Sequence, residues 1–286
     1  MNRLPCPVFD DAAALAVLSE NRRLASFPSL RDHLATMQTA YAQYVAVNGD
    51  VTRVDGVVLP ANVEGYLKQH YVRPPQALAF IDPVRLEGDL NSCPMCGSFA
   101  GGSLDHMMPQ GPYPAFSIYS RNLVPACKCN SRRGTRTRGP APGQRILHPY
   151  FDEVLGRRLL TAKFEDLGIA PKVSLEILLP IAHPDYPAVA FHVETIVKPT
   201  QIRSYLTREW AKLMERPGRI TTALRLNPQS RHALVKILRD ERERADDAGR
   251  NNWESVFYSG LLRPFVTDWL FHRFCRPGRL PNAPLI

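Results

Sequence analysis

Two closely spaced cysteine pairs constrain the fold of this chain more than any other feature. Cys93 and Cys96 are separated by two residues, and Cys127 and Cys129 by one. The segment 91–140 that contains them has few aliphatic residues, so apolar packing alone could not order it. Zinc could, because it supplies roughly 10–16 kcal/mol of apparent binding free energy to a thiolate site. We expect the four cysteines to bind a structural Zn²⁺. The alternative is four thiols without a common role.

The overall composition is that of a globular protein with an anionic partner. The chain has 286 residues, a hydrophobic fraction of 44% and a net charge of +9. This length suggests two or three structural units, and the charge favours nucleic acid as a partner over a membrane. The sequence has no signal peptide pattern and no apolar run long enough to span a bilayer. Paired cysteines suit metal binding in a reducing compartment, so we expect a cytoplasmic protein.

The N-terminal part, residues 1–89, has the pattern of a helical region. Asp10 or Asp11 can cap a first helix that runs to about Ala25. A second helix should begin at Pro28 and Ser29, where apolar residues follow at spacings of three and four. Shorter helices are expected at 62–71 and 76–86.

Residues 90–150 are rich in Gly, Pro and Ser and contain the cysteines, and residues 151–286 form a third region. Period-two apolar patterns predict an antiparallel sheet in this third region. Its expected strands are 159–164, 173–179 and 188–197. Helices are expected at 199–215, 228–244 and 252–274. The predicted fold class is therefore α+β.

Four short motifs occur in order along the middle region: Cys93-Pro94-Met95-Cys96, Asp105-His106, Asn122-Leu123 and Cys129-Asn130. In this order and spacing they resemble the HNH endonucleases, the ββα-metal nucleases, and especially their zinc-stapled members. The resemblance is strong over about 50 residues and continues weakly through 146–151. The chain departs from the family pattern in the second cysteine pair, where one residue is missing between Cys127 and Cys129.

The resemblance implies a ββα-metal module with a zinc knuckle, and a role for each residue of the motif. His106 would be the general base that takes a proton from the attacking water, which suits an imidazole. Asp105 and Asn130 would bind one catalytic Mg²⁺ or Mn²⁺, since hard cations prefer oxygen ligands. Asn122 would orient the His106 ring. His148 and His192 are more simply explained as structural residues.

The basic residues of the same region support a nucleic-acid substrate. No Asp or Glu occurs from His106 to Phe151, whereas Arg and Lys are frequent there. Such a window predicts a phosphate-binding surface. The residues expected to contact nucleic acid are Arg121, Lys128, Arg132, Arg133, Arg136 and Arg138.

These observations predict a metal-dependent endonuclease that hydrolyses phosphodiester bonds of DNA, with His106 as general base. The alternative is a zinc-stapled nucleic-acid-binding protein without catalysis. The helical flanks also resemble effectors of bacterial antiphage systems, in which a regulatory partner protein gates the nuclease. That partner would bind the C-terminal half, which has no motif of its own.

Overall fold

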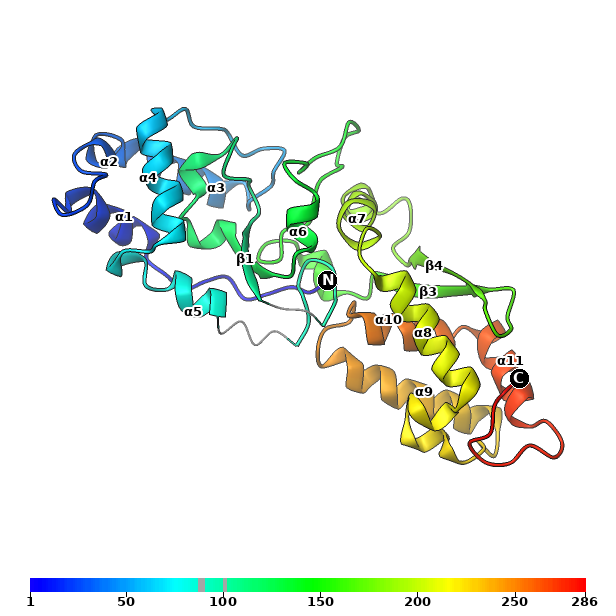
Figure 1. The fold of residues 1–286 in the computed structure, drawn as a ribbon. Helices are drawn as coiled ribbons and strands as arrows, with labels where there is room; N and C mark the ends of the chain where they lie inside the picture. The colour runs from blue at the N-terminus through cyan, green and yellow to red at the C-terminus, as the bar shows by residue number, and fades with distance from the viewer. Residues whose placement is uncertain (87–90, 100–101) are drawn as a thin grey trace.

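The computed structural model describes residues 1–86, 91–99 and 102–286 (Figure 1). Helices predominate in this described part, and two small antiparallel sheets of two strands each accompany them. The α+β class expected from the sequence is therefore confirmed. The expected boundary between residues 89 and 90 lies outside the described residues.

The N-terminal region is helical, as expected. Asp10 caps the first helix, because its carboxylate accepts a hydrogen bond from the Ala13 amide. This helix ends at Glu20, earlier than expected, and the second predicted helix is broken at His33. The elements are α1 (Asp11–Glu20), α2 (Ser29–Asp32), α3 (Leu34–Ala46), α4 (Ala61–Val72), the 3-10 turn η1 (Gln76–Leu78) and α5 (Ile81–Leu86).

A short hairpin and a helix follow in the cysteine-rich region. Strand β1 (Ser103–His106) pairs with β2 (Leu123–Ala126) in antiparallel register, with His106 opposite Leu123. Their connection contains the 3-10 turns η2 (Pro114–Phe116) and η3 (Ser120–Asn122), and helix α6 (Cys129–Arg132) comes shortly after β2. Isolated two-stranded hairpins are marginal in water, so this one depends on neighbouring elements.

The C-terminal region begins with a second hairpin and continues with helices. Strands β3 (Leu160–Glu165) and β4 (Lys172–Ile177) form the second sheet, and the two corresponding predictions are confirmed within two residues. The expected helix at 252–274 is two helices, which meet just before Pro264. The helices are α7 (Tyr186–His192), the π-helical η5 (Val193–Val197), α8 (Ile202–Glu215), the 3-10 turns η6 (Pro217–Arg219) and η7 (Thr222–Arg225), α9 (Arg231–Asp246), α10 (Trp253–Leu261) and α11 (Pro264–Phe274); another 3-10 turn, η4 (Glu153–Gly156), precedes β3.

The strand expected at 188–197 is wrong, because this segment is helical (α7 and η5). Apart from Thr195, its buried residues come in adjacent pairs that recur every four positions: Ala188 and Val189, His192 and Val193, Ile196 and Val197. That recurrence is the period of a helix, and Pro187 in the first turn favours one. The β-branched residues of the segment had suggested a strand instead.

Two hydrophobic clusters form the interior. One joins the N-terminal helices to the first hairpin and includes Met37, Tyr44 and Phe116. The other joins β3 and β4 to the C-terminal helices around Trp210 and Phe257. Figure 1 shows the two groups of helices at opposite ends of the molecule, with β1 and α6 between them. No helix of the described part is long and apolar enough to cross a membrane.

Candidate metal centre and catalytic site

The four predicted zinc ligands converge at one point. Their sulfur atoms all lie within 4.8 Å of one another, with Sγ–Sγ distances of 3.7 Å for Cys93 and Cys129 and 3.5 Å for Cys96 and Cys127. A tetrahedron with Zn–S bonds of about 2.3 Å has edges of about 3.8 Å. Disulfides need about 2.05 Å between sulfurs, so these thiols are not bonded to each other. The cluster can hold a zinc ion.

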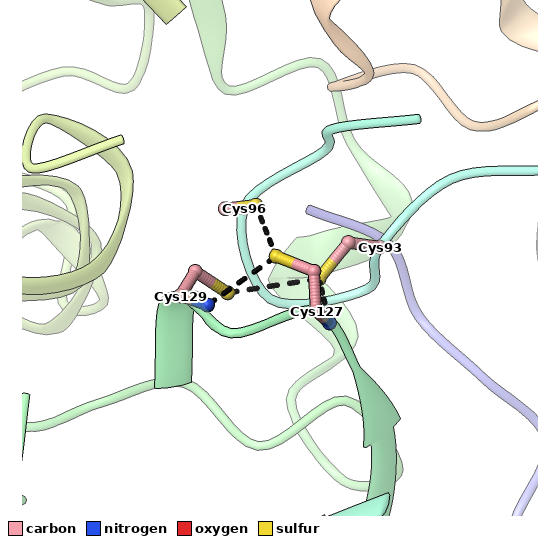
Figure 2. A group of neighbouring side chains, drawn as sticks. All are labelled: Cys93, Cys96, Cys127 and Cys129. Atoms are coloured by element: carbon pink, nitrogen blue, oxygen red, sulfur yellow. Dashed lines mark hydrogen bonds between the residues drawn. The ribbon is translucent and has the colours of Figure 1, made fainter. Parts of the chain in front are cut away.

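Two parts of the chain supply these ligands, as Figure 2 shows. Cys93 and Cys96 lie on a tight turn that a hydrogen bond from the Gly97 amide to the Cys93 carbonyl closes. Gly97 has φ of +78°, a conformation that glycine adopts without strain. Cys127 follows β2, and Cys129 opens α6. Because the chain passes from β2 into α6 at this point, one residue between Cys127 and Cys129 is enough to bring both sulfur atoms to the cluster.

The cysteine cluster is held by the C-terminal region as well. His192 donates from Nε2 to the Met95 carbonyl at 2.7 Å and accepts the Leu147 amide at Nδ1. Trp253 donates to the Cys96 carbonyl at 2.9 Å. Burial lowers the pKa of His192 to about 4, so the ring is neutral at pH 7. His192 is thus a structural residue, as expected.

The surroundings of the Cys127 thiol favour the thiolate, the form that binds zinc. Hydrogen bonds from Cys129, Cys93 and Cys96 lower the pKa of Cys127. The Cys129 amide also points at the Cys127 sulfur, at 3.3 Å. With zinc bound, the Cys129 amide would still donate to the Cys127 sulfur, and the metal would replace the thiol donors.

His106 is held as a neutral imidazole in one tautomer. It is buried, and its Nε2 lies 2.9 Å from the Ser117 carbonyl oxygen. A carbonyl only accepts, so Nε2 carries the proton and Nδ1 keeps a free lone pair. Burial lowers the pKa of His106, although Ser117 and Asp105 act in the opposite direction. The ring can accept a proton at neutral pH, as a general base must.

Tyr71 was not anticipated from the sequence. Its ring packs edge-on against the His106 ring with centroids 4.4 Å apart, and its hydroxyl donates to the Leu104 carbonyl. The Arg85 guanidinium lies over the Tyr71 ring, 4.8 Å from its centroid. Tyr71 belongs to α4, far from the motif in the chain, and no local pattern marks it.

Asp105 precedes His106 in β1, and Asn130 lies in the neighbouring helix α6. One carboxylate oxygen of Asp105 accepts the His106 amide at 2.7 Å. The Asn130 carboxamide donates to the His106 carbonyl at 3.2 Å, which ties α6 to β1. Among the described residues, the other carboxylate oxygen of Asp105 has no hydrogen-bond donor. The three residues are therefore neighbours.

Arg133 bridges the same elements and is not on the surface. Its Nε donates to Asn130 Oδ1 at 2.6 Å, and an Nη donates to the His106 and Met107 carbonyls at 2.8 and 2.9 Å. Burial lowers its pKa to about 10, and nearby Asp105 opposes this. The Arg133 guanidinium is occupied by these hydrogen bonds within the protein, whereas the sequence predicted that it contacts phosphate.

Asn122 holds the connection between the strands of the first hairpin. Its side chain is fully buried, accepts the Met108 amide at 2.7 Å and donates to the Met108 and Phe116 carbonyls. Phe116 immediately precedes Ser117, whose carbonyl accepts from His106. Asn122 therefore acts on His106 through the main chain and does not touch the ring.

The other basic residues divide into exposed and paired groups. Arg145 forms an ion pair with Asp152 at 2.6 Å and lies 3.6 Å from Asp50, so acids outside the acid-free window neutralise it. Arg121 is half-buried and lines a separate cavity of about 720 Å³. Lys128, Arg132, Arg136 and Arg138 are exposed, and no described carboxylate lies within ion-pair distance of them.

Comparison with known proteins finds a partial relative. Over 63 residues the chain is 35% identical to protein ea31 of Escherichia phage lambda. The alignment covers 21% of this chain and 21% of ea31, so the chain spans about a fifth of its relative's length. No protein-family model matches the chain, and no solved structure matches it.

Proposed function

We propose that this protein is a metal-dependent endonuclease of the HNH type that hydrolyses phosphodiester bonds of DNA. The observation that carries the proposal is the fixed tautomer of His106. A buried neutral imidazole with an unprotonated Nδ1, in a residue whose main chain bonds to a carboxylate and a carboxamide, is suited to general-base catalysis.

In this proposal His106 Nδ1 takes the proton from the water that attacks phosphorus. The Ser117 carbonyl stabilises the imidazolium that results, because it accepts a hydrogen bond from Nε2. Tyr71 and the main chain of the hairpin keep the ring in place. General-base assistance of this kind contributes typically 10²–10⁴-fold to a rate.

The donor set fits a divalent ion of the magnesium class. Asp105 offers a carboxylate oxygen without a hydrogen-bond donor among the described residues, and Asn130 offers the second lone pair of Oδ1. A bound Mg²⁺ or Mn²⁺ would stabilise charge on the scissile phosphate and the leaving oxygen. The cysteine cluster, filled with zinc, would brace α6 and thereby Asn130.

The proposed DNA-contacting surface is made of the exposed cations near α6. Lys128 and Arg132 flank Asn130 in the chain, and Arg136 and Arg138 follow in the next loop. Unpaired cations attract phosphate and make binding fall steeply with salt. We expect Arg132→Ala to weaken DNA binding and to reduce its salt dependence.

Nicking of supercoiled plasmid tests the proposal. Wild-type protein should nick in the presence of Mg²⁺ or Mn²⁺ and should stop when these ions are removed by dialysis without a chelator, with the zinc content measured before and after. His106→Ala should lose at least about 100-fold in rate, the lower part of the general-base range. His183→Ala is a matched control, since His183 is part of a loop before α7, and should nick normally. Equal nicking by the His106 variant would refute the assignment.

One observation favours a second candidate, a zinc-stapled nucleic-acid-binding protein without catalysis. The Arg133 guanidinium bonds to Asn130 Oδ1 and places a positive charge beside one of the two proposed metal ligands. This candidate predicts salt-dependent binding of DNA and no turnover with any divalent ion. The plasmid assay separates the two candidates.

A gating partner, as in antiphage systems, is a further proposal for the C-terminal region. The C-terminal helices hold the cysteine turn through His192 and Trp253, so a protein bound there could act on the site. Co-purification from the native host tests it. Full activity of the isolated chain on any DNA would contradict gating.

A further inference from the structure

A cavity of about 500 Å³ lies beside the cysteine cluster and is not used by the proposed chemistry. Its walls come from the cysteine turn, the start of α6, the start of α8 and the start of α10.

Three aromatic rings run along this cavity. The centroids of Phe99 and Tyr205 are 5.6 Å apart, as are those of Tyr205 and Trp253. Phe99 is 48% exposed although it is a large apolar residue. An exposed aromatic ring at the mouth of an aromatic cavity provides a face on which a planar ligand can stack.

The charged residues of the cavity are all basic. Lys128, Arg132 and Arg208 line it, and no Asp or Glu is among the described lining residues. Glu209 follows Arg208 in α8, and its carboxylate lies 3.8 Å from the Arg208 guanidinium and 2.8 Å from the Lys212 ammonium, so it neutralises Arg208 only in part. Gln201 is exposed and offers both a donor and an acceptor at the cavity wall.

We propose that this cavity binds an unpaired nucleobase of the DNA, stacked on Phe99 and Tyr205, with the adjacent phosphates held by Arg132 and Arg208. Aromatic faces interleaved with cations are the features with which proteins bind single-stranded nucleic acid. Cys129 and Arg132 belong to the same short helix as Asn130, so the base would lie next to the proposed cleavage site. The inference rests on the proposed function for this placement, and it specifies unpaired DNA as the substrate class.

Binding of a labelled oligonucleotide tests the inference without cleavage. The probe is a fluorescein-labelled oligothymidylate, compared with an abasic oligonucleotide of the same length and charge, in the His106→Ala background at fixed salt. Phe99→Ala should weaken oligothymidylate binding by about 5- to 150-fold, the range measured for loss of one stacking partner. It should leave binding of the abasic probe unchanged. Arg208→Ala should weaken both probes equally.

Two further variants act as controls. Phe99→Tyr keeps a stacking face and should bind as the parent protein does. Phe265→Ala removes another exposed phenylalanine, 65% exposed on α11, and should have no effect. A thermal melt of each variant establishes that it is folded.

The results separate this inference from the proposed function. Unchanged binding by Phe99→Ala, or an equal loss with the abasic probe, would overturn the base-binding cavity even if plasmid is nicked. A loss that depends on the base would support the cavity even if no nicking occurs, and the protein would then be the non-catalytic binder.

Discussion

Replacing Asn122 with alanine tests how the first hairpin holds His106. The carboxamide is fully buried and makes three hydrogen bonds of 2.7, 3.2 and 2.9 Å to main-chain groups of Met108 and Phe116. In the variant the Met108 amide and carbonyl are stranded in the interior, at about 1 kcal/mol or more each, and the Phe116 carbonyl loses one of two bonds because it keeps the Tyr119 amide. We therefore expect the free energy of unfolding to fall by about 3–4 kcal/mol.

Urea unfolding followed by tryptophan fluorescence measures this loss. Asn62→Ala is the matched control, because Asn62 is exposed and makes one hydrogen bond, to Ser29 at 3.2 Å. Its effect should stay within about 0.5 kcal/mol. A loss below about 1 kcal/mol for Asn122→Ala would refute the reasoning, since it would mean that the connection relaxes without it.

The same variant should affect nicking through the position of Ser117. If the connection shifts, the His106 ring loses its acceptor, and the tautomer with a free Nδ1 is no longer favoured. We expect kcat to fall while KM for plasmid stays nearly constant, measured on protein that remains folded at low temperature. A rise in KM alone would assign Asn122 to DNA binding instead.

Three further predictions concern the metal cluster, its turn and the buried histidines. The purified protein should contain about one zinc per chain by metal analysis, and Cys127→Ser should lose the zinc and melt at a lower temperature. Gly97→Ala should lower the free energy of unfolding by more than about 1 kcal/mol, because φ is +78° and a Cβ would lie 2.2 Å from the Asn251 oxygen. Burial lowers the pKa of His148 to about 3 and of His192 to about 4, from 6.5. Below pH 6.5 these two histidines bind protons in the unfolded chain but stay neutral in the folded protein. The free energy of unfolding should therefore fall between pH 6.5 and 4, by about 1.4 kcal/mol per pH unit for each ring. His192→Gln should reduce that slope in urea titrations, and a slope unchanged by the substitution would contradict the prediction.

The sequence predicted those elements whose signals are local. The cap at Asp10 and the apolar spacing of α3 are such signals, and both helices are present. The prediction for segment 188–197 was wrong because its β-branched residues suggest a strand. The buried pairs that favour a helix can be recognised only once the burial of each residue is known. Packing between distant segments decided the outcome there.

Part of the candidate site was predictable from the sequence, and part was not. The convergence of the four cysteines follows from their spacing and from the scarcity of apolar residues around them. The inward turn of Arg133 and the pairing of Arg145 with Asp152 did not follow, because a count of charges in a window does not say which side chains are buried. Tyr71 reaches His106 from another region of the chain.

The geometry around His106 depends on both neighbours of the first hairpin. Strands of four residues are too short to be stable alone. On one side the cysteine cluster fixes the start of α6, and on the other Tyr71 packs on the His106 ring and Tyr44 bonds to Asn122 and His148. Zinc alone would leave the ring of His106 exposed, and the helices alone would leave Asn130 unfixed. The N-terminal helices are therefore as much a part of the candidate site as the cysteines are.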